Sequence, residues 1–120
     1  MTDRVGVPLE VGVHEAGAAR VVTVAGDLVV SNRDALREAV ERALADNPGR
    51  VVVDAVGLTH VDTTCFALLV QLSKRAREAG RELVVASLPP AFATLARELR
   101  LDEAITFADS VERALDRPGG

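Results

Sequence analysis

The chain has 120 residues, which is enough for one domain with a hydrophobic core and leaves little room for a second. Nearly half of the residues are apolar, but the only aromatic residues are three Phe, so the core must be built from Val, Leu and Ala. The net charge of −4 argues against a nucleic-acid-binding surface, because phosphate backbones are bound mainly by patches of Lys and Arg.

Cysteine content and hydropathy disfavour further classes. Cys65 is the single cysteine, so no disulfide forms within the chain, and no Cys/His cluster has the spacing of a zinc site. No apolar run approaches the roughly 18 residues of a membrane span. Residues 1–4 lack the basic-then-apolar order of a signal peptide. We therefore expect a cytoplasmic protein with no membrane span, no bound metal and no cofactor.

The first predicted elements are two strands. Residues 1–8 are polar or Gly-rich and are expected to be flexible. Apolar and polar residues alternate over 9–13, which is strand period, and a second strand over 21–24 follows a loose turn at 15–19. The strand is expected to break at Gly26-Asp27-Leu28. Two strands this close in sequence predict an antiparallel hairpin.

A helix and a buried strand are predicted next. Ser31 is the expected N-cap, and apolar residues from Ala35 to Leu44 recur as one helical stripe that ends at 46–49. The run Val51-Val52-Val53 predicts a buried central strand that ends at Asp54, and 57–60 are expected to be loop.

The remaining elements alternate regularly. A second helix should begin near Asp62 or Thr63, capped by one of these side chains, and end at Glu78 before Gly80. A strand at 83–86, a helix from Pro89-Pro90 to about residue 99, a strand at 105–107 and a helix capped at 109–110 complete the order.

This order predicts an α/β fold. An N-terminal antiparallel hairpin should join a mainly parallel four- to five-stranded sheet with about four helices. We expect one domain over 9–116, with a flexible segment at 1–8 and a flexible tail at 117–120. The pattern does not decide whether the helices cover one face of the sheet or both.

Enzymatic alternatives rest on a few reactive residues. There is no P-loop, no GxGxxG and no nucleophile-elbow pattern. Cys65 with His60 could form a thiol–base pair, Asp54 with Asp62 a carboxylate pair, and Asp54 alone the acceptor of a receiver domain. However, a Cys in an apolar run is more often core, and the acidic pair and later Lys of a receiver are missing. We expect no catalytic activity.

The segment 61–65 combines a carboxylate with two hydroxyls. Asp62, Thr63 and Thr64 lie together where a loop meets a helix, and six apolar residues follow at 65–70. A half-buried helix needs only about half of its circumference to be apolar, so some of these residues are expected to face outward. An apolar patch beside a modifiable hydroxyl suits protein docking.

Several segments together resemble the STAS domain family, in its anti-sigma-factor antagonist type. The resemblance covers roughly residues 9–115. No one segment is highly specific, but their order and spacing are, and the segments are 51–64, Gly26-Asp27-Leu28, 80–85, 101–105 and 110–115.

The resemblance implies a non-catalytic switch that regulates bacterial transcription, as in stress responses. The unphosphorylated antagonist binds an anti-sigma factor, which is also a serine/threonine kinase. It phosphorylates the hydroxyl after the loop Asp, here Thr63, with Thr64 as second choice, and a PP2C-type phosphatase resets the cycle. The implied partner-binding residues are Asp27, Asp62, Thr63, Thr64, Cys65 and Phe66, and no nucleic acid is bound.

Three positions depart from the family pattern. Cys65 stands where Gly is frequent, Thr63 where Ser is commoner, and Val29 where Asp often follows the Gly-Asp-Leu segment. These departures leave an alternative open. The chain could be a STAS scaffold that is not phosphorylated, serving as a docking subunit of a stress-sensing or transporter ATPase complex.

Overall fold

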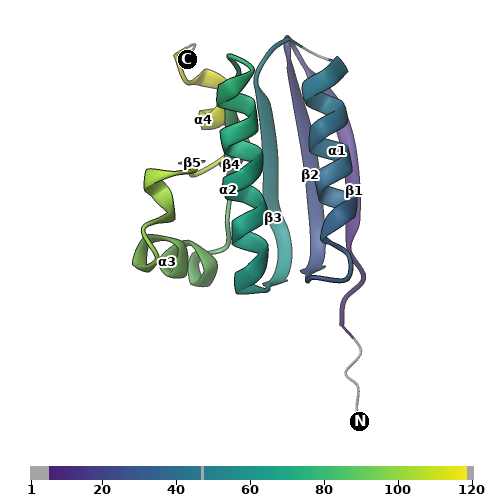
Figure 1. Ribbon diagram of the computed structural model, residues 1–120, viewed down its shortest axis with the longest axis vertical. Coiled ribbons are helices and arrows are strands. Elements are labelled where there is room, and N and C mark those ends of the chain that lie inside the picture. The colour runs from purple at the N-terminus through teal and green to yellow at the C-terminus, as the bar shows by residue number, and fades with distance from the viewer. Residues whose placement is uncertain (1–5, 47, 119–120) are drawn as a thin grey trace.

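The computed structural model describes residues 6–46 and 48–118, which form one sheet with helices on both faces (Figure 1). The elements follow in the order β1 (Glu10–Ala16), β2 (Ala19–Leu28), α1 (Arg33–Asp46), β3 (Val51–Val61), α2 (Thr63–Glu78), β4 (Leu83–Ala86), α3 (Pro90–Glu98), the 3₁₀ helix η1 (Leu101–Glu103), β5 (Thr106–Ala108) and α4 (Val111–Asp116). This order confirms the predicted strand–helix alternation and the α/β fold.

The strands lie in the sheet in chain order, from β1 to β5. β1 is antiparallel to β2, and every other neighbouring pair is parallel. The parallel strands therefore finish at one end of the sheet, called here the carboxyl end, where α1, α2 and α3 begin (Figure 1). The opposite end, where β3 and β4 begin, is called the amino end.

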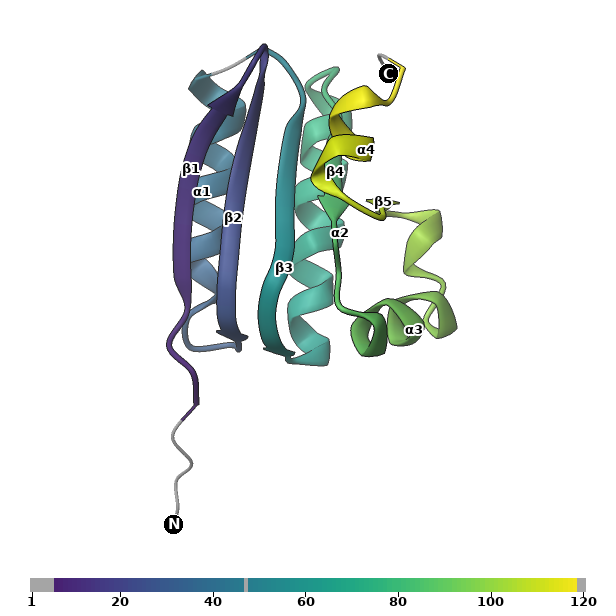
Figure 2. The same cartoon turned by 180° about the vertical axis from the view of Figure 1, so that it is seen from behind.

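Helices cover both faces of the sheet, which the sequence pattern left open. α1 and α2 pack against one face, and α4 lies on the other (Figure 2). This arrangement explains the apolar run that opens β3. Val51 and Val53 belong to the core under α1 and α2, whereas Val52 packs in the smaller core under α4.

β3 is longer than the sequence predicted, because the expected loop at 57–60 is strand. The register between β2 and β3 shifts twice, once after Thr23 and once after Gly26, and each shift adds a residue on β3. Glycine makes both irregularities possible. Gly26 has φ +96, and a Cβ at Gly57 would lie 2.7 Å from the Cβ of Ala25. The expected break in β2 at Gly26 is therefore wrong, since this strand continues to Leu28.

Helix bounds follow the predictions more closely. α2 runs from Thr63 to Glu78, and Gly80 follows it with φ +73. The hydroxyl of Ser110 accepts from the backbone N of Arg113 at 3.1 Å, as a cap of α4 should. α1 begins at Arg33, two residues after the predicted cap.

The predicted flexible termini lie partly outside the described residues, at 1–5 and 119–120. Their described parts are held by hydrogen bonds. The N of Val7 donates to Asp27 Oδ2 at 2.9 Å, and the O of Val7 accepts from Asp27 N at 2.9 Å. The O of Pro118 accepts from Arg50 Nη2 at 3.0 Å.

Two half-buried arginines tie the amino end together. Arg50 pairs through Nε with Glu82 Oε1 at 2.7 Å, and its Nη1 donates to Ala114 O at 2.8 Å. Arg81 donates to the carbonyls of Gly49 and Leu44, the latter at 2.6 Å. These bonds join α4, β4 and the end of α1. No helix within the described ranges is both long and apolar enough to cross a membrane.

Candidate functional site

The predicted acceptor Thr63 is the first residue of α2, at the carboxyl end of the sheet. Asp62 precedes it in an extended conformation, and its backbone N donates to Leu28 O at 2.9 Å. This bond joins the start of α2 to the end of β2. Thr63 and Thr64 are both exposed residues.

Neither predicted side chain caps α2. Asp62 occupies the N-cap position but accepts no capping hydrogen bond, so the expected side-chain cap is wrong. The first turn is closed instead by the backbone, with Cys65 N donating to Asp62 O at 2.8 Å. The N–H groups of Thr63 and Thr64 find no acceptor among the described residues. These free donors, at the positive end of the helix dipole, favour an anion.

The side chains of Cys65 and Phe66, which the resemblance placed among the partner-binding residues, do not reach the surface. Their relative exposures are 0% and 2%, so both side chains belong to the core under α2. Of the six apolar residues, Ala67 is exposed and Val70 is half-buried. A helix has 3.6 residues per turn, so a continuous apolar run must place some of its residues on the exposed face. The run alone does not identify these residues.

The environment of Cys65 does not favour the thiol–base alternative. Burial raises the pKa of Cys65, and the Asp62 carboxylate raises it further, while Arg33 and a hydrogen bond with the Thr64 side chain oppose these effects. A nucleophilic cysteine requires the opposite shift. His60 lies against Phe92 in an edge-to-face contact, with ring centroids 6.4 Å apart.

The carboxylate-pair and receiver alternatives fail because β3 is continuous. Asp54 lies within the strand rather than at its end, and its Oδ1 accepts from Val56 N at 3.2 Å. Asp62 is eight residues further along an extended chain, which separates the two residues by about 25 Å. They cannot act on one substrate group.

Asp27 is fixed in place by its neighbours. Its Oδ2 accepts from Val7 N, its Oδ1 accepts from Thr59 Oγ1 at 2.5 Å, and its backbone O accepts from Asn32 Nδ2 at 2.9 Å. The residue thus connects the N-terminal segment, β3 and the loop before α1. Its carboxylate shapes the surface beside α2.

Sequence reasoning missed the exposed apolar residues of this region. Val7 is 50% exposed and Val30 is 52% exposed, and both lie at the carboxyl end of the sheet. We call Val7, Val30, Asp62, Thr63 and Thr64 the docking surface. A shallow hollow of about 770 Å³ beside it is lined partly by Val7. The sequence signal that could have indicated this apolar surface is the pair Val29-Val30, directly after Gly26-Asp27-Leu28.

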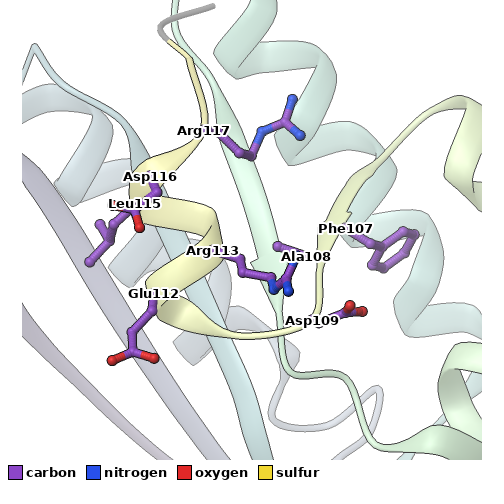
Figure 3. Close-up of a pocket in the computed structure, with 8 residues that line it drawn as sticks. All are labelled: Phe107, Ala108, Asp109, Glu112, Arg113, Leu115, Asp116 and Arg117. Atoms are coloured by element: carbon purple, nitrogen blue, oxygen red, sulfur yellow. The ribbon is translucent and has the colours of Figure 1, made fainter.

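Another hollow, of about 1040 Å³, lies over α4 and β5, and Figure 3 shows the residues that line it. Asp109 and Glu112 point away from one another there, so the polar groups do not converge on one point (Figure 3). Within the part of the chain that is described, no group of His, Cys, Asp and Glu is arranged to hold a metal ion. The hydroxyls at the start of α2 therefore remain the better candidate.

Comparison with known proteins agrees with this fold. A sequence model described as "Mlab, STAS domain" matches residues 11–109. Rv2638 of Mycobacterium tuberculosis, a candidate anti-anti-sigma factor, is 29% identical over 104 residues, which cover 85% of this chain and 70% of that protein.

Two solved structures have the same architecture. An anti-sigma factor antagonist from Mycobacterium paratuberculosis matches with a TM-score of 0.76 at 21% identity, over 90% of this chain and 92% of that one. A variant of RsbS from Moorella thermoacetica matches with a TM-score of 0.72 at 22% identity, over 88% and 92%. At such identities, the likeness shows the fold alone.

Proposed function

Because the chain belongs to the STAS domain family, we propose that it is an anti-sigma-factor antagonist that is switched by phosphorylation of Thr63. The observation that carries this proposal is the exposed Thr63, the first residue of α2, at a helix start that no side chain caps. The similarity to Rv2638 supports the antagonist role. The protein itself catalyses no reaction and acts in the cytoplasm by binding.

The partner is an anti-sigma factor that is also an ATP-dependent serine/threonine kinase. It binds the docking surface, where the exposed Val7 and Val30 supply apolar contacts at the same end of the sheet as Thr63 and Thr64. Binding withdraws the anti-sigma factor from its sigma factor and so permits transcription. Phe66 lies in the first turn of α2 and anchors this turn in the hydrophobic core.

Phosphorylation ends the complex by adding charge. Thr63 Oγ1 attacks the γ-phosphorus of ATP, the bond to ADP breaks, and the hydroxyl proton passes to a base of the kinase. The product carries about −1.5 to −2 charges beside Asp62. Free N–H groups at the helix start stabilise this charge within the domain, but a partner packed on it would have to desolvate it. A PP2C-type phosphatase then restores the hydroxyl.

Intact-mass analysis tests the modification. Incubation with the candidate kinase and ATP should add one phosphate, about 80 Da, to the wild type and to Thr64→Ala, and none to Thr63→Ala. Thr64 is the matched control because it is exposed on the same turn. A gain that survives Thr63→Ala but is lost in Thr64→Ala would move the site by one residue.

A binding titration tests the switch separately. Thr63→Glu should weaken the complex with the anti-sigma factor by at least 30-fold, roughly 2 kcal/mol, while leaving the melting temperature unchanged. Thr94→Glu, an exposed Thr on α3, is the control that adds the same charge elsewhere. Equal affinities of the wild type, Thr63→Glu and Thr94→Glu would contradict a switch that acts through charge at Thr63.

The second candidate is a STAS scaffold that is never phosphorylated. The departure at Cys65 raised this alternative, since a side chain in place of Gly could obstruct a kinase. Its side chain is buried, however, so it does not project towards a kinase at Thr63. The scaffold predicts a stable complex that ignores Thr63→Glu, and the same titration therefore separates the two functions.

A further inference from the structure

Arg33 lies at the carboxyl end of the sheet together with Thr63. It is the first residue of α1, as Thr63 is of α2, and the two helices contact one another and begin at the same end (Figure 1). The preceding Asn32 fixes this loop, because its Oδ1 accepts from Val29 N at 3.0 Å and its Nδ2 donates to Asp27 O. The start of α1 is thus held in place.

The charge of Arg33 influences Cys65, which lies in the first turn of α2. It lowers the pKa of Cys65, against the larger effects of burial and Asp62. Arg33 is also half-buried, which limits the range of positions its guanidinium can reach. Helices in contact lie about 8–10 Å apart, a gap that an arginine and a phosphorylated threonine can bridge from both sides.

Arg33 has no charged partner among the described residues. By contrast, Arg37 on the same helix pairs with Asp34, and Arg75 on α2 pairs with Glu41. The Asp62 carboxylate likewise forms no ion pair there. A phosphate on Thr63 would add to the negative charge of Asp62, so the nearby cation without a partner becomes the natural counter-charge.

We propose that Arg33 is the intramolecular cation that pairs with the phosphate on Thr63. This inference rests on the proposed function, because it concerns the phosphorylated form. The guanidinium forms charge-assisted hydrogen bonds with two phosphate oxygens, and the free N–H groups at the start of α2 bind the third. The phosphate is thereby bound by its own domain, and it covers part of the docking surface that the partner would otherwise contact.

The test places phosphothreonine at position 63 by genetic encoding, so that no kinase is needed. Three proteins are compared, which are the wild type, Arg33→Gln and Arg42→Gln. Arg42 is the matched control because it is exposed on the same helix and has no ion-pair partner in the described ranges. Asp27, His60, Asp62 and Cys65, which are titratable groups at the carboxyl end of the sheet, are the same in all three.

The second ionisation of the phosphate is followed by phosphorus NMR as the pH is raised. Its midpoint should lie about half a unit to one unit higher in Arg33→Gln than in the wild type and in Arg42→Gln. Equal midpoints in all three proteins would overturn the proposal.

A second measurement keeps the test independent of the folding of Arg33→Gln. In the wild type, the side-chain Nε–H signal of Arg33 should move with the same midpoint as the phosphate, and an unchanged signal would overturn the proposal. Failure of every kinase to modify Thr63, with the encoded phosphate still paired to Arg33, would refute the phosphorylation cycle alone.

Discussion

The two ends of the sheet treat their charged residues differently. At the amino end, Arg50 and Arg81 donate to backbone carbonyls, and Arg50 also pairs with Glu82. At the carboxyl end, neither Arg33 nor Asp62 forms an ion pair with any of the described residues. Arg50 and Arg81 thus hold the fold at the amino end, whereas Arg33 and Asp62 contribute no ion pair at the carboxyl end, where Asp27 is the charged residue that is bonded to its neighbours. Under the proposed function, the arginine bonds that stabilise the fold and the surface that binds the partner lie at opposite ends of one small domain.

The largest expected effect tests the packing of the core at the carboxyl end, where Arg33 and Asp62 form no ion pairs with the described residues. Phe66→Ala should lower the free energy of unfolding by about 3–5 kcal/mol, because the ring is buried in the main hydrophobic core. Ala67→Ser, on the exposed side of the same turn, should change it by less than about 0.5 kcal/mol. Urea denaturation measures both. A small loss for Phe66→Ala would mean that this end is loose in its core as well.

The next effect tests the amino end. Arg50→Ala should lower the free energy of unfolding by about 2–3 kcal/mol. The substitution leaves Arg117 as the only ion-pair partner of Glu82 among the described residues, and it removes the donor to Ala114 O. Arg33→Ala should cost less than about 1 kcal/mol, because no ion pair with the described residues is lost. Thermal unfolding of the two variants gives the comparison, and similar losses would contradict the division between the ends.

Two helix starts provide a smaller contrast. Ser110→Ala should destabilise the protein by about 1 kcal/mol, because the hydroxyl caps α4. Asp62→Ala should cost less than about 0.5 kcal/mol, because its side chain makes no capping bond. A loss of about 1 kcal/mol for Asp62→Ala in chemical denaturation would show that its carboxylate supports the fold after all.

The smallest effect concerns alkaline pH. Burial raises the pKa of Cys65 above the value of about 8.5 that an unfolded thiol has. As the pH rises through 8.5, the thiol ionises in the unfolded chain but keeps its proton in the fold, so the free energy of unfolding decreases. Cys65→Ala should show a shallower decrease between pH 8 and 10. Parallel pH profiles of the two proteins would indicate that the thiol is not protected.

The sequence predicted those elements whose residues act locally. β4 has the predicted bounds because four apolar residues stand between a Gly-containing turn and a Pro pair. α2 likewise begins and ends where expected. The Ser110 cap was predictable because capping depends on residues close in the chain.

The site was less predictable because it depends on tertiary contacts. The strand from Asp54 to Val61 contains Gly57 and Thr59, which suit a loop, and only pairing with β2 makes it extended. Asp62 is a residue type that caps helices, yet its side chain makes no such bond. The role inferred for Arg33 depends on the packing of α1 against α2, which no local pattern specifies.

The strand order has a consequence for synthesis. Each strand pairs with the strand made just before it, so the sheet can grow by addition while the chain leaves the ribosome. The sheet face that packs against α4 cannot be covered in this way, because α4 follows all five strands in the chain. Val21, Val52 and Val84 await α4, and Arg50 meets the carbonyl of Ala114 only when that helix has been made. A chain that lacks α4 would therefore expose this apolar face of the sheet, a surface prone to aggregation.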